Sequence, residues 1–377
     1  MIAFNEAPIV ESSTRYVSQA LADRHVSGDG PFTKRCHAWI EERTGVQKAL
    51  LTTSGTAALE MAALLCGLEP GDEVILPSFT FSSTATAFVN VGARLVFVDV
   101  RPDTMNIDEV KIEAAITDRT RVIVVVHYGG IACDMDAIMR IAARYGLKVV
   151  EDAAQGVMSS YRGASLGAIG DFGCYSFHET KNYSMGEGGA LLIRDAVHNE
   201  PAEVLREKGT NRSKFFRGQV DKYTWVDYGS SYLPSDINAA YLYSQLECAD
   251  VINDDRLASW NYYYDALTPL RDAGLIRLPV VSPGCVHNAH LFRIMTADLA
   301  ERTRLIAYLR ERGIMATFHY VPLHSAPAGR KFGRFHGRDE FTTAESDKLV
   351  RLPMYYGMAK EDRTAVVEAV SDFYRTR

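Results

Sequence analysis

The sequence has few of the features that mark metal centres or disulfide-stapled proteins. Its 377 residues include six cysteines, and these are scattered along the chain. None forms a CxxC pair or a Cys/His cluster with the spacing of a metal site. We therefore expect reduced, buried thiols and no metal.

Long hydrophobic runs and long blocks of one charge are also missing. No stretch of about 18 apolar residues occurs, as a membrane helix requires, and no secretion signal is visible at the start. The net charge of −6 is spread along the chain, which argues against a nucleic-acid groove or a polybasic membrane surface. We expect a cytoplasmic protein that binds neither nucleic acid nor membrane and whose partners are small and soluble.

Lysine is scarce, with 11 residues against 30 arginines. Lys181 follows an apolar run and closes the segment Ser176-Phe177-His178-Glu179-Thr180-Lys181, just before a glycine-rich turn. Unlike arginine, a lysine can lose its proton when it is desolvated and can then attack a carbonyl carbon. The segment alone is equally consistent with a cofactor-anchoring lysine and with an ordinary surface lysine at the end of a strand.

Short β-branched runs alternate with helical patterns between Thr44 and Ile193. This alternation is typical of the α/β class, with a mainly parallel central sheet covered by helices. The predicted strands are Lys48–Thr52, Glu73–Pro77, Leu95–Val100, Val122–His127, Lys148–Asp152, Gly173–Phe177 and Ala190–Ile193. The predicted helices are Ala57–Cys66, Asp108–Ile116 and Met135–Tyr145.

The pattern changes towards the C-terminus. A long helical stretch is predicted to run, with breaks, from Ser235 towards Ala273. Beyond it the sequence predicts strands at Ala289–Met295 and Met315–Tyr320 and helices at Ala300–Arg312 and Glu361–Tyr374. We expect a large α/β domain over residues 1–250 and a smaller C-terminal α+β domain over residues 251–377.

Residues just beyond the carboxyl ends of parallel strands are the best candidates for a ligand site. Gly55 and Thr56 open a predicted helix, where free N–H groups favour a phosphate, although a plain N-cap would explain them too. Phe81 could stack on a planar ligand or belong to the core, and Asp152 could cap a helix or pair with a buried cation. Together with Lys181 they indicate one site at one edge of the sheet.

Several segments resemble the DegT/DnrJ/EryC1 family of pyridoxal-phosphate (PLP)-dependent nucleotide-sugar aminotransferases. They are Ser54-Gly55-Thr56-Ala57-Ala58-Leu59, Pro77-Ser78-Phe79-Thr80-Phe81, Phe97-Val98-Asp99-Val100, Glu151-Asp152-Ala153-Ala154-Gln155, Ser176–Lys181, Gly186-Glu187-Gly188-Gly189, His319–His324 and Leu352-Pro353. The resemblance covers nearly the whole chain. It implies the aspartate aminotransferase-like fold, PLP fold type I, and a homodimer with shared active sites.

Longer segments resemble one branch of that family, the TDP-4-keto-6-deoxyglucose 4-aminotransferases of the TDP-4-amino-4,6-dideoxygalactose transaminase type. These segments are Gly28–Arg35, Arg101–Asp108, Arg206–Arg212 and Phe216–Trp225. The resemblance implies a TDP-linked 4-keto-6-deoxy sugar as amino acceptor and an amino acid, glutamate, as donor. It does not distinguish the galacto from the gluco product.

The resemblance also implies roles for individual residues. Lys181 would form the Schiff base with PLP and transfer protons, and Asp152 would pair with the pyridinium nitrogen so that the cofactor becomes an electron sink. The other residues with implied cofactor contacts are Gln155 at the ring hydroxyl, Ser176, Gly55 and Thr56 at the phosphate, and Phe81 on the ring face. His178 would contact substrate or support its loop.

One segment departs from the family pattern. Family members commonly have Asn-Tyr-Arg where this chain has Ser231-Tyr232-Leu233. The resemblance implies that Ser231 reaches the cofactor phosphate of the partner subunit through its hydroxyl, while the arginine contact is missing. His324 is a weaker candidate for the substrate pocket.

Three other functions share part of this pattern. Another PLP enzyme of the same fold, either one acting on a different keto sugar or a lyase or desulfurase, would have the lysine and the acid but not the long matching segments. A sugar 3-dehydratase would have histidine in place of Lys181. A non-catalytic phosphate- or nucleotide-binding α/β protein would lack the visible absorbance of a lysine-bound cofactor.

Overall fold

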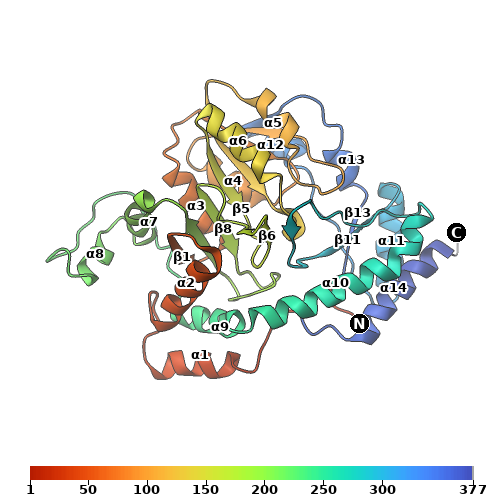
Figure 1. Cartoon of the computed structure of the whole chain (residues 1–377), viewed down its shortest axis with the longest axis horizontal. Coiled ribbons are helices and arrows are strands. Elements are labelled where there is room, and N and C mark those ends of the chain that lie inside the picture. Colours follow the sequence, from red (N-terminus) through yellow and green to blue (C-terminus); the bar gives the residue numbers. More distant parts are fainter. Residues whose placement is uncertain (376–377) are drawn as a thin grey trace.

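A computed structural model describes residues 1–375, and its centre is an eight-stranded sheet (Figure 1). The strand order is β1-β9-β8-β5-β4-β2-β3-β12, and β9 runs in the opposite direction to the other seven strands. The strands are β1 (Lys48–Thr52), β2 (Glu73–Pro77), β3 (Arg94–Val98), β4 (Thr120–Val126), β5 (Lys148–Asp152), β8 (Phe172–Ser176), β9 (Gly189–Ile193) and β12 (Gly333–Phe335). The α/β class and the mainly parallel sheet are therefore confirmed, and the three-residue β12 is an edge strand that sequence patterning did not reveal.

Helices cover both faces of the sheet, which explains why its strands are apolar throughout. Alternate strand residues point to opposite faces, so Ile75 and Val125 belong to one buried cluster while Val74 and Val124 belong to another. The first face is covered by α2 (Pro31–Thr44), α5 (Glu109–Ala115), α6 (Met135–Tyr145) and α9 (Asp236–Leu246). The second face is covered by α3 (Gly55–Leu65), α4 (Ser82–Val89) and α7 (Asn199–Arg206).

The C-terminal third has an apolar cluster of its own, which Ile2 joins from the N-terminus. Its two-stranded sheet pairs β11 (Phe292–Met295) with β13 (Leu349–Leu352). The helices beside it are α10 (Ala249–Asp272), α11 (Leu299–Glu311) and α14 (Lys360–Arg375). Figure 1 shows these elements beside the large sheet, with both termini at the same end of the molecule. The division at residue 250 stays a prediction.

The strand predicted at Met315–Tyr320 is wrong. Within it only Thr317 makes a β-bridge, to Arg351, and the bridge just before it joins Ile314 to Ile2. The strand that pairs with β11 is instead β13, which sequence patterning missed. The segment reads as a strand because its residues are apolar and β-branched or aromatic, but its last two side chains line a cavity instead of continuing a ladder.

Residues 207–231 form an arm that extends away from the body of the molecule and carries the short helix α8 (Arg212–Phe216; Figure 1). Bridges between Glu207 and Ser231 and between Thr210 and Trp225 close its base. Its aromatic side chains are exposed, with Trp225 at 78% and Tyr228 at 80%. Within residues 1–375, no helix has the length and apolarity needed to cross a membrane.

Glu151, on the penultimate position of β5, anchors the loop that leads to β8. Its side chain is fully buried and accepts hydrogen bonds from the N–H groups of Gly167 (2.8 Å), Ile169 (2.7 Å) and Gly170 (2.6 Å). His127 Nδ1 accepts from the Cys133 N–H, so Nε2 carries the ring proton and donates to Glu151 at 2.9 Å. This one carboxylate therefore fixes the two strands whose ends face the cavity described below.

We expect Glu151→Gln to lower the free energy of unfolding by about 3 kcal/mol, because the amide NH₂ would face backbone donors and the buried charge-assisted bonds would be lost. Urea denaturation followed by circular dichroism measures the change. Glu311→Gln, at the exposed end of α11, is the control and should change stability by no more than about 0.5 kcal/mol. Equal stability of the two variants would contradict the anchoring role of Glu151.

Candidate active site

A cavity of about 650 Å³ lies at the carboxyl edge of the large sheet. Its lining residues include eight of the site residues predicted from the sequence: Gly55, Thr56, Phe81, Asp152, Gln155, Ser176, His178 and Lys181. The C-terminal third supplies His290, His319, Tyr320 and Arg351, and Phe4 comes from the N-terminal segment. The site is thus built from segments that are far apart in the chain.

Lys181 lies five residues beyond β8, in a turn where its N–H donates to the His178 carbonyl at 2.9 Å. Its ammonium makes no hydrogen bond or ion pair with any residue from 1 to 375. Burial and the Arg351 charge lower the pKa of Lys181, while the Asp152 carboxylate raises it, and the outcome is a pKa of about 8. A substantial fraction of this amine is therefore neutral and nucleophilic near physiological pH.

Asp152 is the last residue of β5, the strand that pairs with β8. Its Oδ2 accepts from Thr84 Oγ1 at 2.6 Å and its Oδ1 accepts from the Ala154 N–H at 3.1 Å. Because Thr84 gives its proton to Asp152, Thr80 donates to Thr84 at 2.8 Å and holds it in place. The carboxylate is therefore fixed in direction and keeps lone pairs available towards the cavity.

The start of helix α3 has the features of a phosphate site. Ser54 caps the helix by accepting from the Ala57 N–H at 3.0 Å, while the N–H groups of Gly55 and Thr56 have no acceptor within the helix. A Cβ on Gly55 would lie 2.9 Å from Ser176 Cβ, so only glycine lets these two segments meet. The Ser176 hydroxyl, beside Gly55, is a further donor for an anion.

An aromatic face and an amide complete the part of the site that was predicted. Phe81 precedes helix α4 and lines the cavity. It is 61% exposed, which is unusual for a large apolar ring, so the ring is open to a ligand. The Gln155 oxygen accepts from the Gly129 N–H at 2.6 Å, and its nitrogen donates to Tyr320 Oη at 3.2 Å. One hydrogen of the Gln155 amide is left for a ligand oxygen.

The structure adds residues that the sequence argument did not assign. His319 stacks on Tyr320 with ring centroids 4.0 Å apart, and its Nδ1 lies 3.2 Å from Tyr128 Oη. Burial, together with the charges of Arg351 and Lys181, lowers the pKa of His319 strongly, so the ring is neutral. The resemblance of the segment from His319 to His324 was the one signal that pointed here.

The contacts and positions of three predicted residues, His178, Ser231 and His324, limit the roles that they can have. His178 lines the cavity, but its Nδ1 lies 2.9 Å from Thr180 Oγ1 and supports the loop. Ser231 is exposed at the base of the arm and does not line the cavity of its own chain. His324 does not line the cavity either, because its ring is held by Ser78 at 2.7 Å and Asp339 at 3.2 Å, and its assignment to the substrate pocket stays a prediction.

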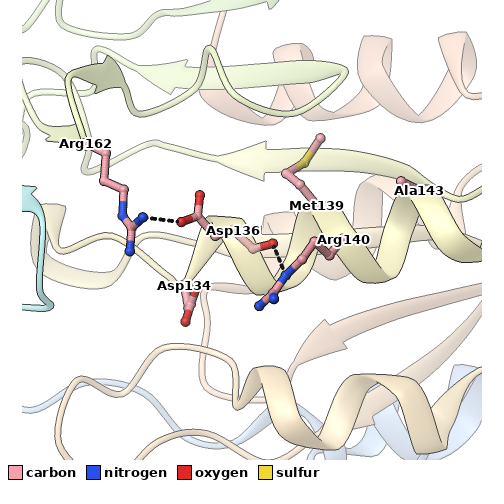
Figure 2. Close-up of a pocket in the computed structure, with 6 residues that line it drawn as sticks. All are labelled: Asp134, Asp136, Met139, Arg140, Ala143 and Arg162. Atoms are coloured by element: carbon pink, nitrogen blue, oxygen red, sulfur yellow. Dashed lines mark hydrogen bonds and ion pairs between the residues drawn. The ribbon is translucent and has the colours of Figure 1, made fainter.

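A second hollow of about 650 Å³ lies on the surface beside the start of helix α6 (Figure 2). Figure 2 shows the pairing of Arg162 with Asp136, whose closest atoms lie 2.8 Å apart, and the hydrogen bond from Arg140 to the Asp136 carbonyl, which is 3.1 Å long. The third acid, Asp134, accepts from the Ala137 N–H and from Tyr161 Oη. Such self-paired surface charges leave little for a ligand to bind. Residues 1–375 also contain no group of three or more His, Cys, Asp or Glu side chains arranged to hold a metal ion.

The residues of the first cavity fit PLP. They offer an amine with a lowered pKa, a fixed carboxylate for a ring nitrogen, an anion site at a helix N-terminus and an exposed aromatic face. These features define the class of a PLP-dependent enzyme of fold type I. The family comparison agrees, because the model of the DegT/DnrJ/EryC1/StrS aminotransferase family matches residues 8–371, and the chain belongs to that family.

Individual relatives support the same assignment. The spore coat polysaccharide biosynthesis protein SpsC of Bacillus subtilis is 34% identical over 92% of this chain and 90% of its own length. The aminotransferase TlmJ from Streptoalloteichus hindustanus superimposes with a TM-score of 0.91 at 28% identity, covering 100% of this chain and 99% of its own. Spr1654 from Streptococcus pneumoniae, solved in PMP and PLP forms, gives TM-scores of 0.89 and 0.88 at 25% identity, covering 100% of this chain and 100% and 99% of its own.

The chain is thus a PLP-dependent sugar aminotransferase, with PLP and pyridoxamine phosphate (PMP) as the two forms of its cofactor. The expected fold type and cofactor are confirmed. The roles of the individual site residues stay predictions, and so does the cytoplasmic location.

The lowered pKa of Lys181 predicts how the apo-protein combines with PLP as the pH changes. Only the neutral amine reacts, so the rate should rise with pH and level off above a midpoint near pH 8, instead of the 10.5 of an ordinary lysine. Because the Asp152 carboxylate raises the pKa of Lys181, Asp152→Asn should move the midpoint to lower pH. Stopped-flow absorbance measures both rates, and a midpoint above pH 10 in the wild type would contradict the assignment.

Proposed function

We propose that this enzyme moves an amino group from an amino acid, glutamate, to C4 of TDP-4-keto-6-deoxy-D-glucose, forming a TDP-4-amino-4,6-dideoxyhexose. The observation that carries the catalytic part is that one cavity is lined by Lys181, in the turn beyond β8 and with a pKa of about 8, and by Asp152 at the end of the neighbouring strand β5. A lysine in this setting serves both as a nucleophile and as a proton carrier.

When bound, PLP supplies an electron sink that lowers the cost of removing a proton from the carbon next to the transferred nitrogen. Asp152 would pair with the ring nitrogen and keep its proton, and the hydrogen bonds from Thr84 and Ala154 fix the direction of its carboxylate. Lys181 Nζ takes the proton from the donor's α-carbon and returns one on the acceptor side. The neutral fraction of its amine makes the first step accessible at neutral pH.

The geometry supports the remaining cofactor contacts that we propose. The N–H groups of Gly55 and Thr56 and the Ser176 hydroxyl would bind the phosphate, Gln155 would donate its free amide hydrogen to the ring hydroxyl, and Phe81 would cover one face of the ring. His178 keeps the Lys181 turn in place through its contact with Thr180 and contributes to catalysis only through that loop. These assignments account for every predicted lining residue.

The sugar specificity is supported by the long segments that resemble the 4-aminotransferase branch. Two of them are joined in the fold: Arg206 pairs with Asp29 at 2.7 Å and donates through Nε to the Leu51 carbonyl at 2.8 Å. Leu51 lies on β1, the strand that leads to the phosphate-binding turn. These two segments, Gly28–Arg35 and Arg206–Arg212, are therefore tied to the strand that leads to the site.

Incubation with TDP-4-keto-6-deoxyglucose and glutamate should give the 4-amino sugar nucleotide and 2-oxoglutarate. The H3–H4 and H4–H5 couplings of the isolated product, measured by NMR, distinguish galacto from gluco. Lys181→Ala should abolish both the product and the visible absorbance of the attached cofactor, while Lys360→Ala, at the exposed start of α14, serves as the matched control. Release of product by the Lys181 variant, or amination at another carbon, would contradict the proposal.

We further propose a homodimer in which the arm of each subunit reaches the active site of the other. Support comes from the exposed aromatics of the arm, Phe216, Tyr223, Trp225 and Tyr228, which a monomer would leave in water. Ser231 lies at the base of the same arm and outside the cavity of its own chain, as a residue that serves the partner would.

Mixing inactive variants tests this arrangement. Subunits of Lys181→Ala refolded with subunits of Trp225→Ala should regain activity, because one site of each hybrid dimer then has both an intact lysine and an intact arm. Lys181→Ala mixed with Asp152→Asn should regain none, since both residues come from one chain. Gel filtration giving an active monomer, or no recovery in the first mixture, would argue against shared sites.

A further inference from the structure

Three histidines line the cavity, namely His178, His290 and His319. Both ring nitrogens of His178 and both of His319 contact other side chains. In His290, which lies two residues before β11, Nδ1 contacts Asn182 and Nε2 makes no hydrogen bond to residues 1–375. This Nε2 is also not enclosed by protein atoms, so it is the one histidine nitrogen of the cavity that the described residues leave for a ligand.

The hydrogen bonds around His290 determine which of its ring nitrogens carries the proton. Asn182 Nδ2 donates to the Asn288 carbonyl at 2.9 Å, so it is Asn182 Oδ1 that faces the imidazole. An amide oxygen can only accept, and His290 Nδ1 therefore donates its proton to it at 2.9 Å. A neutral imidazole has a single N–H proton. Nε2 consequently presents a lone pair to the cavity.

The ring stays neutral because its surroundings oppose a positive charge. Burial lowers the pKa of His290 well below its ordinary value, and the charges of Lys181, Arg256 and Arg351 add to this effect. Arg256 is held beside the segment by donating to the carbonyls of Ala289 and His290 at 3.2 and 2.7 Å. A neutral acceptor binds neither a carboxylate nor a phosphate. Its partner must be a group that donates a hydrogen, such as a hydroxyl or an amine.

The position of His290 is fixed from two sides. Its N–H donates to Asn288 Oδ1 at 3.0 Å, and Asn288 Nδ2 donates to the Gln155 carbonyl at 2.8 Å, in the segment that follows β5. On the other side, Asn182, which accepts from the ring, directly follows Lys181 in the chain. An acceptor held this firmly beside the reacting centre can select a substrate by the position of one donor group.

We propose that His290 Nε2 accepts a hydrogen bond from the C3 hydroxyl of the sugar and so selects a sugar that carries this hydroxyl. The inference rests on the function proposed above, in which the amine is delivered to C4. Of the two carbons beside C4, C5 carries the methyl group and the ring oxygen, so C3 is the one with a hydroxyl. That hydroxyl is two bonds from the reacting carbon and must lie near Lys181, as His290 does.

The other groups of the cavity explain why this hydroxyl needs an acceptor. Its cations, Lys181 and Arg351, and the N–H groups at the start of α3 can donate hydrogen bonds but cannot accept one. A hydroxyl that leaves water without finding an acceptor is costly, and a site that supplies one rejects an analogue lacking the hydroxyl. The hydroxyl is also unchanged by the reaction, whereas the donor's amine and Lys181 both take part in it.

Comparing TDP-4-keto-6-deoxyglucose with its 3-deoxy analogue tests the inference on the holoenzyme. The two substrates react in turn, so kcat/KM for the sugar and kcat/KM for glutamate each report one half-reaction. The wild type should prefer the hydroxylated sugar by about 30-fold, and His290→Leu should prefer it by no more than about threefold. Comparing the two ratios cancels the intrinsic difference in reactivity between the sugars. The kcat/KM of His290→Leu for glutamate should stay within about threefold of the wild type.

Two further variants separate a contact with the sugar from a structural role. His290→Gln offers an amide oxygen as acceptor and should recover part of the preference for the hydroxylated sugar. His198→Gln is the matched control, because burial lowers the pKa of His198 too and its ring packs on Phe172 at 4.9 Å, outside the cavity. It should keep the full preference. Partial unfolding of a variant lowers kcat/KM equally for both sugars and leaves their ratio unchanged.

The outcomes distinguish this inference from the function on which it rests. If the wild type aminates C4 but treats the two sugars alike, or if His290→Leu keeps the wild-type preference, His290 does not bind the C3 hydroxyl. Equal losses in the glutamate and sugar half-reactions of His290→Leu, with the preference retained, would assign Nε2 to Lys181 and overturn the inference. Amination at a carbon other than C4 would instead refute the proposed function, and this inference with it.

Discussion

The electrostatic balance at Lys181 is the constraint on which the rest of the site depends. A buried ammonium near Arg351 would lose its proton too readily, and one held tightly by a carboxylate would keep it. Burial and Arg351 act in one direction, Asp152 acts in the other, and the result is a pKa of about 8. The balance requires Asp152 at a set separation, which the pairing of β5 with β8 provides. Thr84 and Ala154 then keep the carboxylate from rotating away.

The same balance explains why the sheet edge is so heavily anchored. Glu151 ties the loop before β8 to β5, and Ser54 caps the helix that would bind the phosphate. The Glu151 side chain is fully buried, and the Ser54 hydroxyl is engaged by the Ala57 N–H although Ser54 lines the cavity. Both restrict backbone segments whose displacement by even one ångström would change the contacts of Lys181 or Gly55. Polar residues that look functional in the sequence therefore divide into those that face the cavity and those that hold its walls.

Much of the large sheet and its edge could be predicted from the sequence, because both depend on local patterns. Strands buried on both faces appear in the sequence as short apolar runs, and the residues at or beyond their ends are the natural site candidates. Asp152 and Lys181, predicted in this way, both line the cavity. His290, His319 and Arg351 could not be placed in this way, since they reach the cavity from the C-terminal third through contacts that no local pattern encodes. The missed strand β13 and the wrongly predicted strand at Met315–Tyr320 are parts of that same region.

Arg351 shows why such residues matter for the chemistry. The large sheet supplies everything that the cofactor needs, namely a phosphate site, a carboxylate, an aromatic face and an amine. An aminotransferase must also accept two unlike substrates in turn in one cavity, and the second wall is where they can be told apart. Arg351 lies in that second wall, where its hydrogen bond to His319 gives the guanidinium a fixed place in the cavity. The groups that fit the cofactor and the groups of this second wall therefore reach one cavity from different parts of the chain.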